Sequence, residues 1–233
     1  MRRALAAVLL STALPLAAET LAIVGGTVHT VGPQGTIEGG TVLVRDGKIA
    51  AVGRDVAVPA GTRTIDARGK VVTPGLFDSL TRLGVVEVDQ VDETRDFAVE
   101  DDEITAALTV AGAINPNSML IPVNRIEGLT RAVVAPGPGE SLIAGQAAII
   151  HLGTGSDLVV RAPAAMVAVL GEQGMRRAGG ARGAALLRLR EALQDAEDYA
   201  ANRAAFERGE RRGYAVSRRD LEARGPVVRG ALP

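Results

Sequence analysis

The first third of the chain alternates short apolar runs with glycine-containing turns, a pattern typical of β-strands. Val42 and Val44, and again Ile49 and Ala51, follow a period of two. The Asp46-Gly47 pair between them favours a tight hairpin turn, because both central positions of such a turn need positive φ. We therefore predict a small antiparallel sheet. Its predicted strands are Leu21–Val24, Thr27–Val31, Thr41–Arg45, Lys48–Val52, Arg63–Asp66 and Lys70–Thr73.

The pattern changes at Pro74-Gly75. Beyond it, buried-type strands are predicted at Leu129–Ala135, Ala147–Leu152 and Ala165–Leu170, and a long helix from Ala184 to about Arg208. A short helix with Ser217 as its cap is predicted to end at Gly225-Pro226. Strands first, and then strands alternating with helices, indicate a sheet domain that leads into an α/β domain.

Residues 1–18 have the layout of a secretory signal peptide. Arg2 and Arg3 precede an apolar run from Ala4 to Leu16, and the small residues Ala17 and Ala18 follow. The alternative is a membrane anchor, but the run is shorter than the ~20 apolar residues that a spanning helix needs. We expect cleavage after Ala18 and an exported product, periplasmic or secreted, with no membrane attachment.

Composition excludes several functions. The net charge of -1 gives no reason to expect nucleic acid as a partner. The chain has no cysteine, which excludes cysteine nucleophiles and thiolate metal sites.

The acidic stretch from Glu87 to Glu103 suggests either a cation site or a solvated loop. Its spacing does not fit a calcium-binding loop, which favours the solvated loop.

Two stretches carry a family resemblance: Gly40–Gly53, with its Val-Arg-Asp-Gly-Lys-Ile centre, and Thr64–Asp78, which ends in Pro-Gly-Leu-Phe-Asp. Together they resemble the amino-terminal region of the amidohydrolase superfamily, in particular its imidazolonepropionase-like branch. The resemblance implies an α/β fold with a small β-sandwich over residues 19–73. Residues 74–233 would then form an incomplete (β/α)8 barrel of the TIM type.

The same resemblance locates the metal site of active members, which bind zinc through a His-x-His motif just after the aspartate. Residues two apart on a strand face the same side, so both imidazoles can reach one ion. Here the matching positions hold Leu80 and Arg82. Leucine has no lone pair to donate and arginine stays protonated. The other candidate ligands, His29 and His151, match no ligand motif of the family. We therefore expect no catalytic residue, metal or cofactor in this chain.

A remaining set of polar residues, comprising Asp78, Asn124, Arg125 and Glu127, is a candidate pocket lining. The alternatives are that Arg125 and Glu127 form a solvated pair and that Asp78 only bonds backbone. The resemblance implies a hydrolase acting on carbon–nitrogen bonds other than peptide bonds.

The stretch from Thr73 to Pro233 is shorter than the roughly 250 residues of a complete barrel. We therefore expect a truncated product that is inactive by itself. A non-catalytic periplasmic binding or partner subunit, or a fragment without function, is the alternative. The expected partner is an unknown small molecule or a second subunit.

Overall fold

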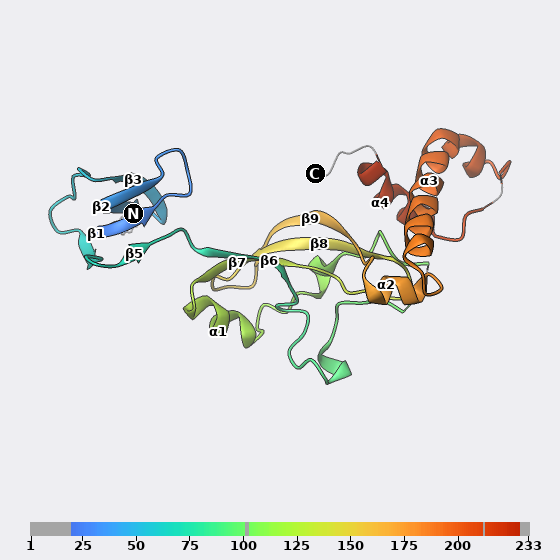
Figure 1. The fold of residues 1–233 in the computed structure, drawn as a ribbon, viewed down its shortest axis with the longest axis horizontal. Helices are drawn as coiled ribbons and strands as arrows, with labels where there is room; N and C mark the ends of the chain where they lie inside the picture. The colour runs from blue at the N-terminus through green and yellow to red at the C-terminus, as the bar shows by residue number, and fades with distance from the viewer. Residues whose placement is uncertain (1–19, 101–102, 212, 229–233) are drawn as a thin grey trace, which may run out of the picture. The chain divides into compact units, whose positions relative to one another are not determined.

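The computed structural model describes residues 20–100, 103–211 and 213–228 of the 233-residue chain. They divide into two compact units, with the boundary between Pro74 and Gly75. Figure 1 shows the strands of the first unit in blue to teal. The elements of the second unit follow in green, yellow and red. The predicted signal peptide, residues 1–18, lies outside the described residues.

The first unit is a five-stranded sheet. Its strands are β1 (Thr20–His29), β2 (Thr36–Arg45), β3 (Lys48–Gly53), β4 (Arg63–Asp66) and β5 (Val71–Val72). The order is β3-β2-β1-β4, and β5 also pairs with β1. Strands β1 to β3 are antiparallel, as predicted, but β4 and β5 run parallel to β1. Residues 54–62 cross from the β3 edge to the far side of β1, and such a crossover permits parallel pairing.

The two predicted glycine turns of this sheet have different outcomes: one is a hairpin turn and the other lies inside a strand. Asp46 (φ 52°) and Gly47 (φ 70°) form the predicted hairpin turn between β2 and β3. The Gly25-Gly26 pair, predicted to separate two strands, instead lies inside the single strand β1, whose register with β2 shifts there. Gly25 has a φ of 80°, and a Cβ on Gly26 would meet Val72 at 2.9 Å. The glycines therefore make an irregularity within a strand.

The second unit contains a four-stranded sheet of order β6-β7-β8-β9. Its strands are β6 (Leu76–Thr81), β7 (Leu129–Val134), β8 (Ile143–His151) and β9 (Val159–Ala168). The first pair is parallel, and α1 (Leu120–Ile126) precedes β7 in the connection. Two short 3-10 turns, Asp92–Thr94 and Val110–Ala113, also lie in this connection.

The strand–helix alternation predicted for this region is wrong from β7 onward. Strands β7, β8 and β9 follow one another as antiparallel neighbours. The connections at residues 135–142 and 152–158 are too short to hold a crossover helix. A complete (β/α)8 barrel, which needs eight parallel strands, is therefore not formed by the described residues.

The core of the second unit is aliphatic, in keeping with a chain that is only 2% aromatic. One buried cluster joins the connection after β6 to the strands of the sheet. Phe97 is its one aromatic member. The buried residues are Leu83, Val85, Val86, Phe97, Val110, Ile121, Ala132, Val134, Ala148, Ile150, Leu152 and Leu158.

Three helices follow the sheet: α2 (Glu172–Arg177), α3 (Arg182–Glu207) and α4 (Arg218–Val228). The long helix α3 confirms the prediction, and so does the cap of α4, where Ser217 Oγ accepts a hydrogen bond from the Asp220 amide at 3.2 Å. The predicted end at Gly225-Pro226 is wrong. Proline removes only one donor, and here it does so in the last described turn. Among the described residues, no helix has the length and apolarity to span a bilayer.

A buried polar network attaches α4 to the sheet. The fully buried Asp220 carboxylate accepts hydrogen bonds from the amides of Thr105 and Ala107, at 2.9 and 2.8 Å, and from the Thr105 hydroxyl. Arg224, 3% exposed, pairs with Asp220 at 3.0 Å. Gln146 of β8 donates to the Ala106 carbonyl at 2.9 Å, which completes the link.

We predict that Asp220→Ala lowers the free energy of unfolding of the second unit by about 3–5 kcal/mol, because it leaves the Arg224 charge and two amides buried without their partner. Denaturant unfolding monitored by circular dichroism measures this. Glu197→Ala, at an exposed position of α3, is the control and should change stability by less than about 0.5 kcal/mol. Equal stabilities of the two variants would contradict the role given to Asp220.

Candidate functional site

The family resemblance places its metal chemistry at Asp78, Leu80 and Arg82, which lie on β6 or directly after it. Asp78 is half-buried and opposite Ala132 of β7. Its Oδ1 accepts a hydrogen bond from the Leu80 amide at 3.0 Å, so this carboxylate bonds backbone at the end of the strand. The Leu80 side chain is 70% exposed. The pairing with β7 shifts register between Asp78 and Thr81, and β6 forms the edge of the sheet.

Arg82 lies against an aromatic ring. Its guanidinium carbon is 3.9 Å from the centroid of the Phe97 ring, within the range of a cation–π interaction. Arg95 lies over the same ring at 5.2 Å and forms an ion pair with Asp92 at 2.9 Å. Arg82 has no carboxylate partner among the described residues. Arg82, at the position where the resemblance implies a second histidine, is therefore held by an aromatic contact.

The described part of the acidic stretch 87–103 does not form a cation site. Asp92 is paired with Arg95, and the chain around Phe97 packs into the core. Across the described ranges, which exclude Asp101 and Asp102, no group of three or more His, Cys, Asp or Glu side chains is arranged to hold a metal ion.

Both histidines have hydrogen-bond partners close to them in the sequence. His29 Nδ1 lies 2.8 Å from the Thr36 hydroxyl in the first unit. His151 Nδ1 accepts a hydrogen bond from the Gly153 amide at 3.0 Å, and its Nε2 lies 2.9 Å from the Asp157 carbonyl. An amide can only donate and a carbonyl can only accept, so these partners fit the neutral tautomer protonated at Nε2. Leu80 and Arg82 give no donor atom either, so the described residues do not fit the zinc of active family members.

The other proposed pocket residues lie on or just after α1. Asn124 Nδ2 donates to the Leu120 carbonyl at 2.8 Å within the helix. Arg125 Nη1 donates to the Leu152 carbonyl at 2.9 Å, which connects α1 to the end of β8. Glu127 is exposed at the end of the helix. These three residues and Asp78 line neither of the two large cavities described next.

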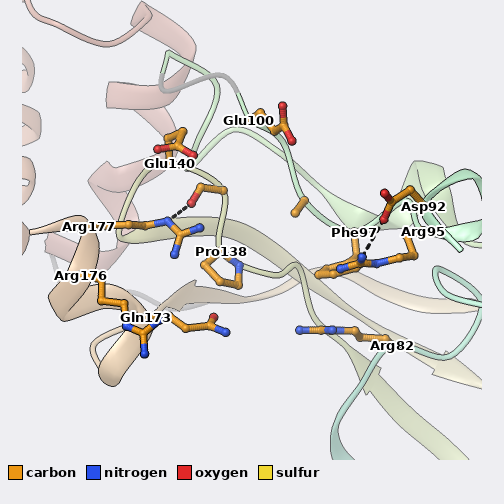
Figure 2. A pocket seen from close by; sticks show the side chains of 12 residues that line it. Arg82, Asp92, Arg95, Phe97, Glu100, Pro138, Glu140, Gln173, Arg176 and Arg177 are labelled. Atoms are coloured by element: carbon orange, nitrogen blue, oxygen red, sulfur yellow. Dashed lines mark hydrogen bonds and ion pairs between the residues drawn. The ribbon is translucent and has the colours of Figure 1, made fainter. Parts of the chain in front are cut away.

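The first cavity, which we call the arginine cavity, has a volume of about 700 Å³ and lies beyond the carboxyl end of β6. Figure 2 shows Arg82, Arg95 and Phe97 on one side, and Gln173, Arg176 and Arg177 of α2 on the other. Arg177 Nε donates to the Gly139 carbonyl, and Arg176 forms an ion pair with Glu172. The complete lining is Arg82, Asp92, Arg95, Phe97, Ala98, Glu100, Pro138, Gly139, Glu140, Gln173, Arg176 and Arg177.

The second cavity, the apolar groove, has a volume of about 710 Å³ and shares Arg82, Pro138 and Gln173 with the first. The rest of its lining is mainly aliphatic. The groove is lined by Leu80, Thr81, Arg82, Ala135, Pro136, Gly137, Pro138, Val167, Ala168, Val169, Leu170, Gly171 and Gln173. Arg82 thus stands where a polar cavity meets an apolar one.

Of the residues singled out in the sequence, Leu80 and Arg82 belong to these cavities. The sequence did not predict that Phe97, Gln173 and Arg177 line a cavity. Their sequence neighbourhoods contain no motif, because they come together only through the parallel pairing of β6 with β7 and the position of α2 after β9.

Comparisons with known proteins bear on the family resemblance. No family model matches the chain. The imidazolonepropionase of Klebsiella pneumoniae is 51% identical over 51 residues, which cover 22% of this chain and 12% of that protein. The dihydroorotase of Geobacter metallireducens is 34% identical over 125 residues, or 53% of this chain and 28% of that protein.

The fold is that of a solved amidohydrolase from Thermotoga maritima, with a TM-score of 0.72 and 22% identity over 90% of this chain and 55% of that one. The chain is related to the amino-terminal part of the amidohydrolase superfamily. It spans 12% and 28% of the length of the two curated relatives.

We predict that Arg82→Ala lowers the free energy of unfolding by about 0.5–1 kcal/mol, because the cation–π contact with Phe97 is lost. A double-mutant cycle with Phe97→Leu, followed by denaturant unfolding, isolates this contact. Arg190→Ala, at an exposed position of α3, is the control. If the effect of Arg82→Ala is the same in the Phe97→Leu background, the two side chains are not coupled.

Proposed function

We propose that the chain is part of an exported protein of the amidohydrolase type, whose family hydrolyses carbon–nitrogen bonds other than peptide bonds, and that it does not perform this hydrolysis by itself. The family relationship supports the amidohydrolase part of the proposal, and the signal-peptide layout of residues 1–18 supports export. The second half rests on Leu80 and Arg82, which stand where the resemblance implies the first two metal ligands, and on the contact of Arg82 with Phe97.

The physical reason lies in the chemistry of the ligands. Hydrolysis in this family needs a water whose pKa is lowered by a bound metal, and a catalytic zinc is generally held by three protein ligands. A guanidinium at the second ligand position adds a permanent positive charge close to where the ion would be bound. No other described side chain is placed to compensate.

Metal analysis of the purified chain tests this proposal. We expect zinc well below one ion per chain after dialysis, and no hydrolysis of a cyclic amide such as dihydrouracil. The variant Leu80→His with Arg82→His places two imidazoles on β6 and serves as the matched control, which should retain more zinc. One or two tightly bound zinc ions in the natural chain, together with hydrolysis, would refute the proposal.

The alternative function is that of a non-catalytic periplasmic partner subunit, and the open edge of β6 favours it. Within the described residues β6 pairs with β7 alone, and its edge carries Leu76, Phe77 and Leu80, which are 58%, 51% and 70% exposed. An unpaired edge with exposed apolar side chains is a template for pairing with another strand.

Sedimentation of the chain over a range of concentrations tests this alternative for self-association. Association through the edge should weaken in Phe77→Lys, because a charge on an edge strand opposes pairing. Leu187→Lys, at an exposed position of helix α3, is the control and should leave association unchanged. A chain that stays monomeric throughout would count against pairing between two copies.

A further inference from the structure

The arginine cavity and the apolar groove lie at the carboxyl ends of the parallel strands β6 and β7. Ligands of α/β proteins commonly bind in crevices at this end of a sheet. Each cavity falls within the 300–1,000 Å³ typical of small-molecule sites. Because they share three residues, one ligand can occupy both.

The charges at the junction favour an anion. The Arg82 guanidinium lies over the Phe97 ring and pairs with no carboxylate among the described residues, so its N–H groups are available for an acceptor. Gln173 adds an amide from the opposite wall, and Figure 2 shows Arg82 and Gln173 extending toward one another. A planar guanidinium matches a carboxylate with two parallel hydrogen bonds.

The carboxylates around the cavity restrict where the anion can bind. Asp92 and Glu172 are paired with Arg95 and Arg176. Glu100 and Glu140 have no ion pair among the described residues, and Figure 2 places them on the rim opposite Arg82. An anion is therefore repelled from the upper rim and attracted to the Arg82 side, next to the groove.

The groove supplies the second half of the recognition. Leu80, Val167 and Leu170 line it together with Ala135 and Pro136. An exposed arginine alone binds a carboxylate weakly, since water and salt screen the pair. Apolar groups bound in the groove would add the affinity that the ion pair lacks.

We propose that this junction binds a small organic acid with an apolar body, its carboxylate on Arg82 and Gln173 and its hydrocarbon part in the apolar groove. The site uses side chains of this chain alone and needs no metal. It therefore does not rest on the proposed function, and it would exist whether or not the chain takes part in hydrolysis.

Titration calorimetry of the purified chain with linear carboxylates from butanoate to octanoate tests the proposal. Affinity should rise about 3- to 4-fold for each methylene that enters the groove. Octanamide, which has the same body without the charge, should bind at least about 10-fold more weakly. Succinate and inorganic phosphate, which lack an apolar body, should bind more weakly than octanoate.

Two variants separate the contacts from the fold. Arg82→Gln should lower the affinity for octanoate and for butanoate, each about 10-fold. Arg190→Gln should leave both affinities unchanged. Leu80→Asn should weaken octanoate binding and leave butanoate nearly unchanged. Its control is Leu186→Asn, at a position on α3 that is also exposed (54%) and lies outside both cavities.

Four results would overturn the proposal. The first is an affinity that does not depend on the length of the acid, which would show that the groove does not bind the hydrocarbon part. The second is equal affinity for octanamide and octanoate, which would show that Arg82 does not bind the carboxylate. The third is unchanged octanoate binding in both Arg82→Gln and Leu80→Asn, provided that circular dichroism shows both variants folded. The last is the absence of saturable binding by any acid.

Discussion

The second unit depends on one buried carboxylate. Asp220 is the point at which α4 meets residues 105–107, and that segment in turn is bonded to β8 through Gln146. The contact joins residues 115 positions apart in the sequence. Burying a carboxylate is unfavourable unless its acceptor sites are filled, and here two amides, a hydroxyl and Arg224 fill them. Because α3 packs on α4, the attachment of the long helix depends on the same group.

The sequence predicted those parts of the fold that follow from local chemistry. The Asp46-Gly47 turn, the long helix α3 and the Ser217 cap each depend on neighbouring residues, and the structure confirms them. What was wrong depended on pairing between distant segments. The parallel direction of β4 and the meander from β7 to β9 are set by which edge a strand joins, and a period-two pattern does not encode that choice.

The same distinction applies to the site. Leu80 and Arg82 were singled out because the family resemblance implies a His-x-His motif at these positions, just after Asp78. The contact of Arg82 with Phe97 and the approach of α2 could not be read in this way, since each requires a tertiary arrangement. Where the resemblance implies an imidazole, the guanidinium of Arg82 offers no lone pair to a cation and presents N–H donors instead.

The position of β6 also has a consequence for folding. Strands β7, β8 and β9 form two consecutive hairpins, so the contacts between them join residues that are close in sequence. Pairing β6 with β7 instead requires closure of the long connection from residue 82 to 128, and a longer loop carries a larger entropic penalty. The meander is therefore expected to assemble first and β6 to join last. The strand end that carries Leu80 and Arg82 would then be the least protected part of this sheet against local opening.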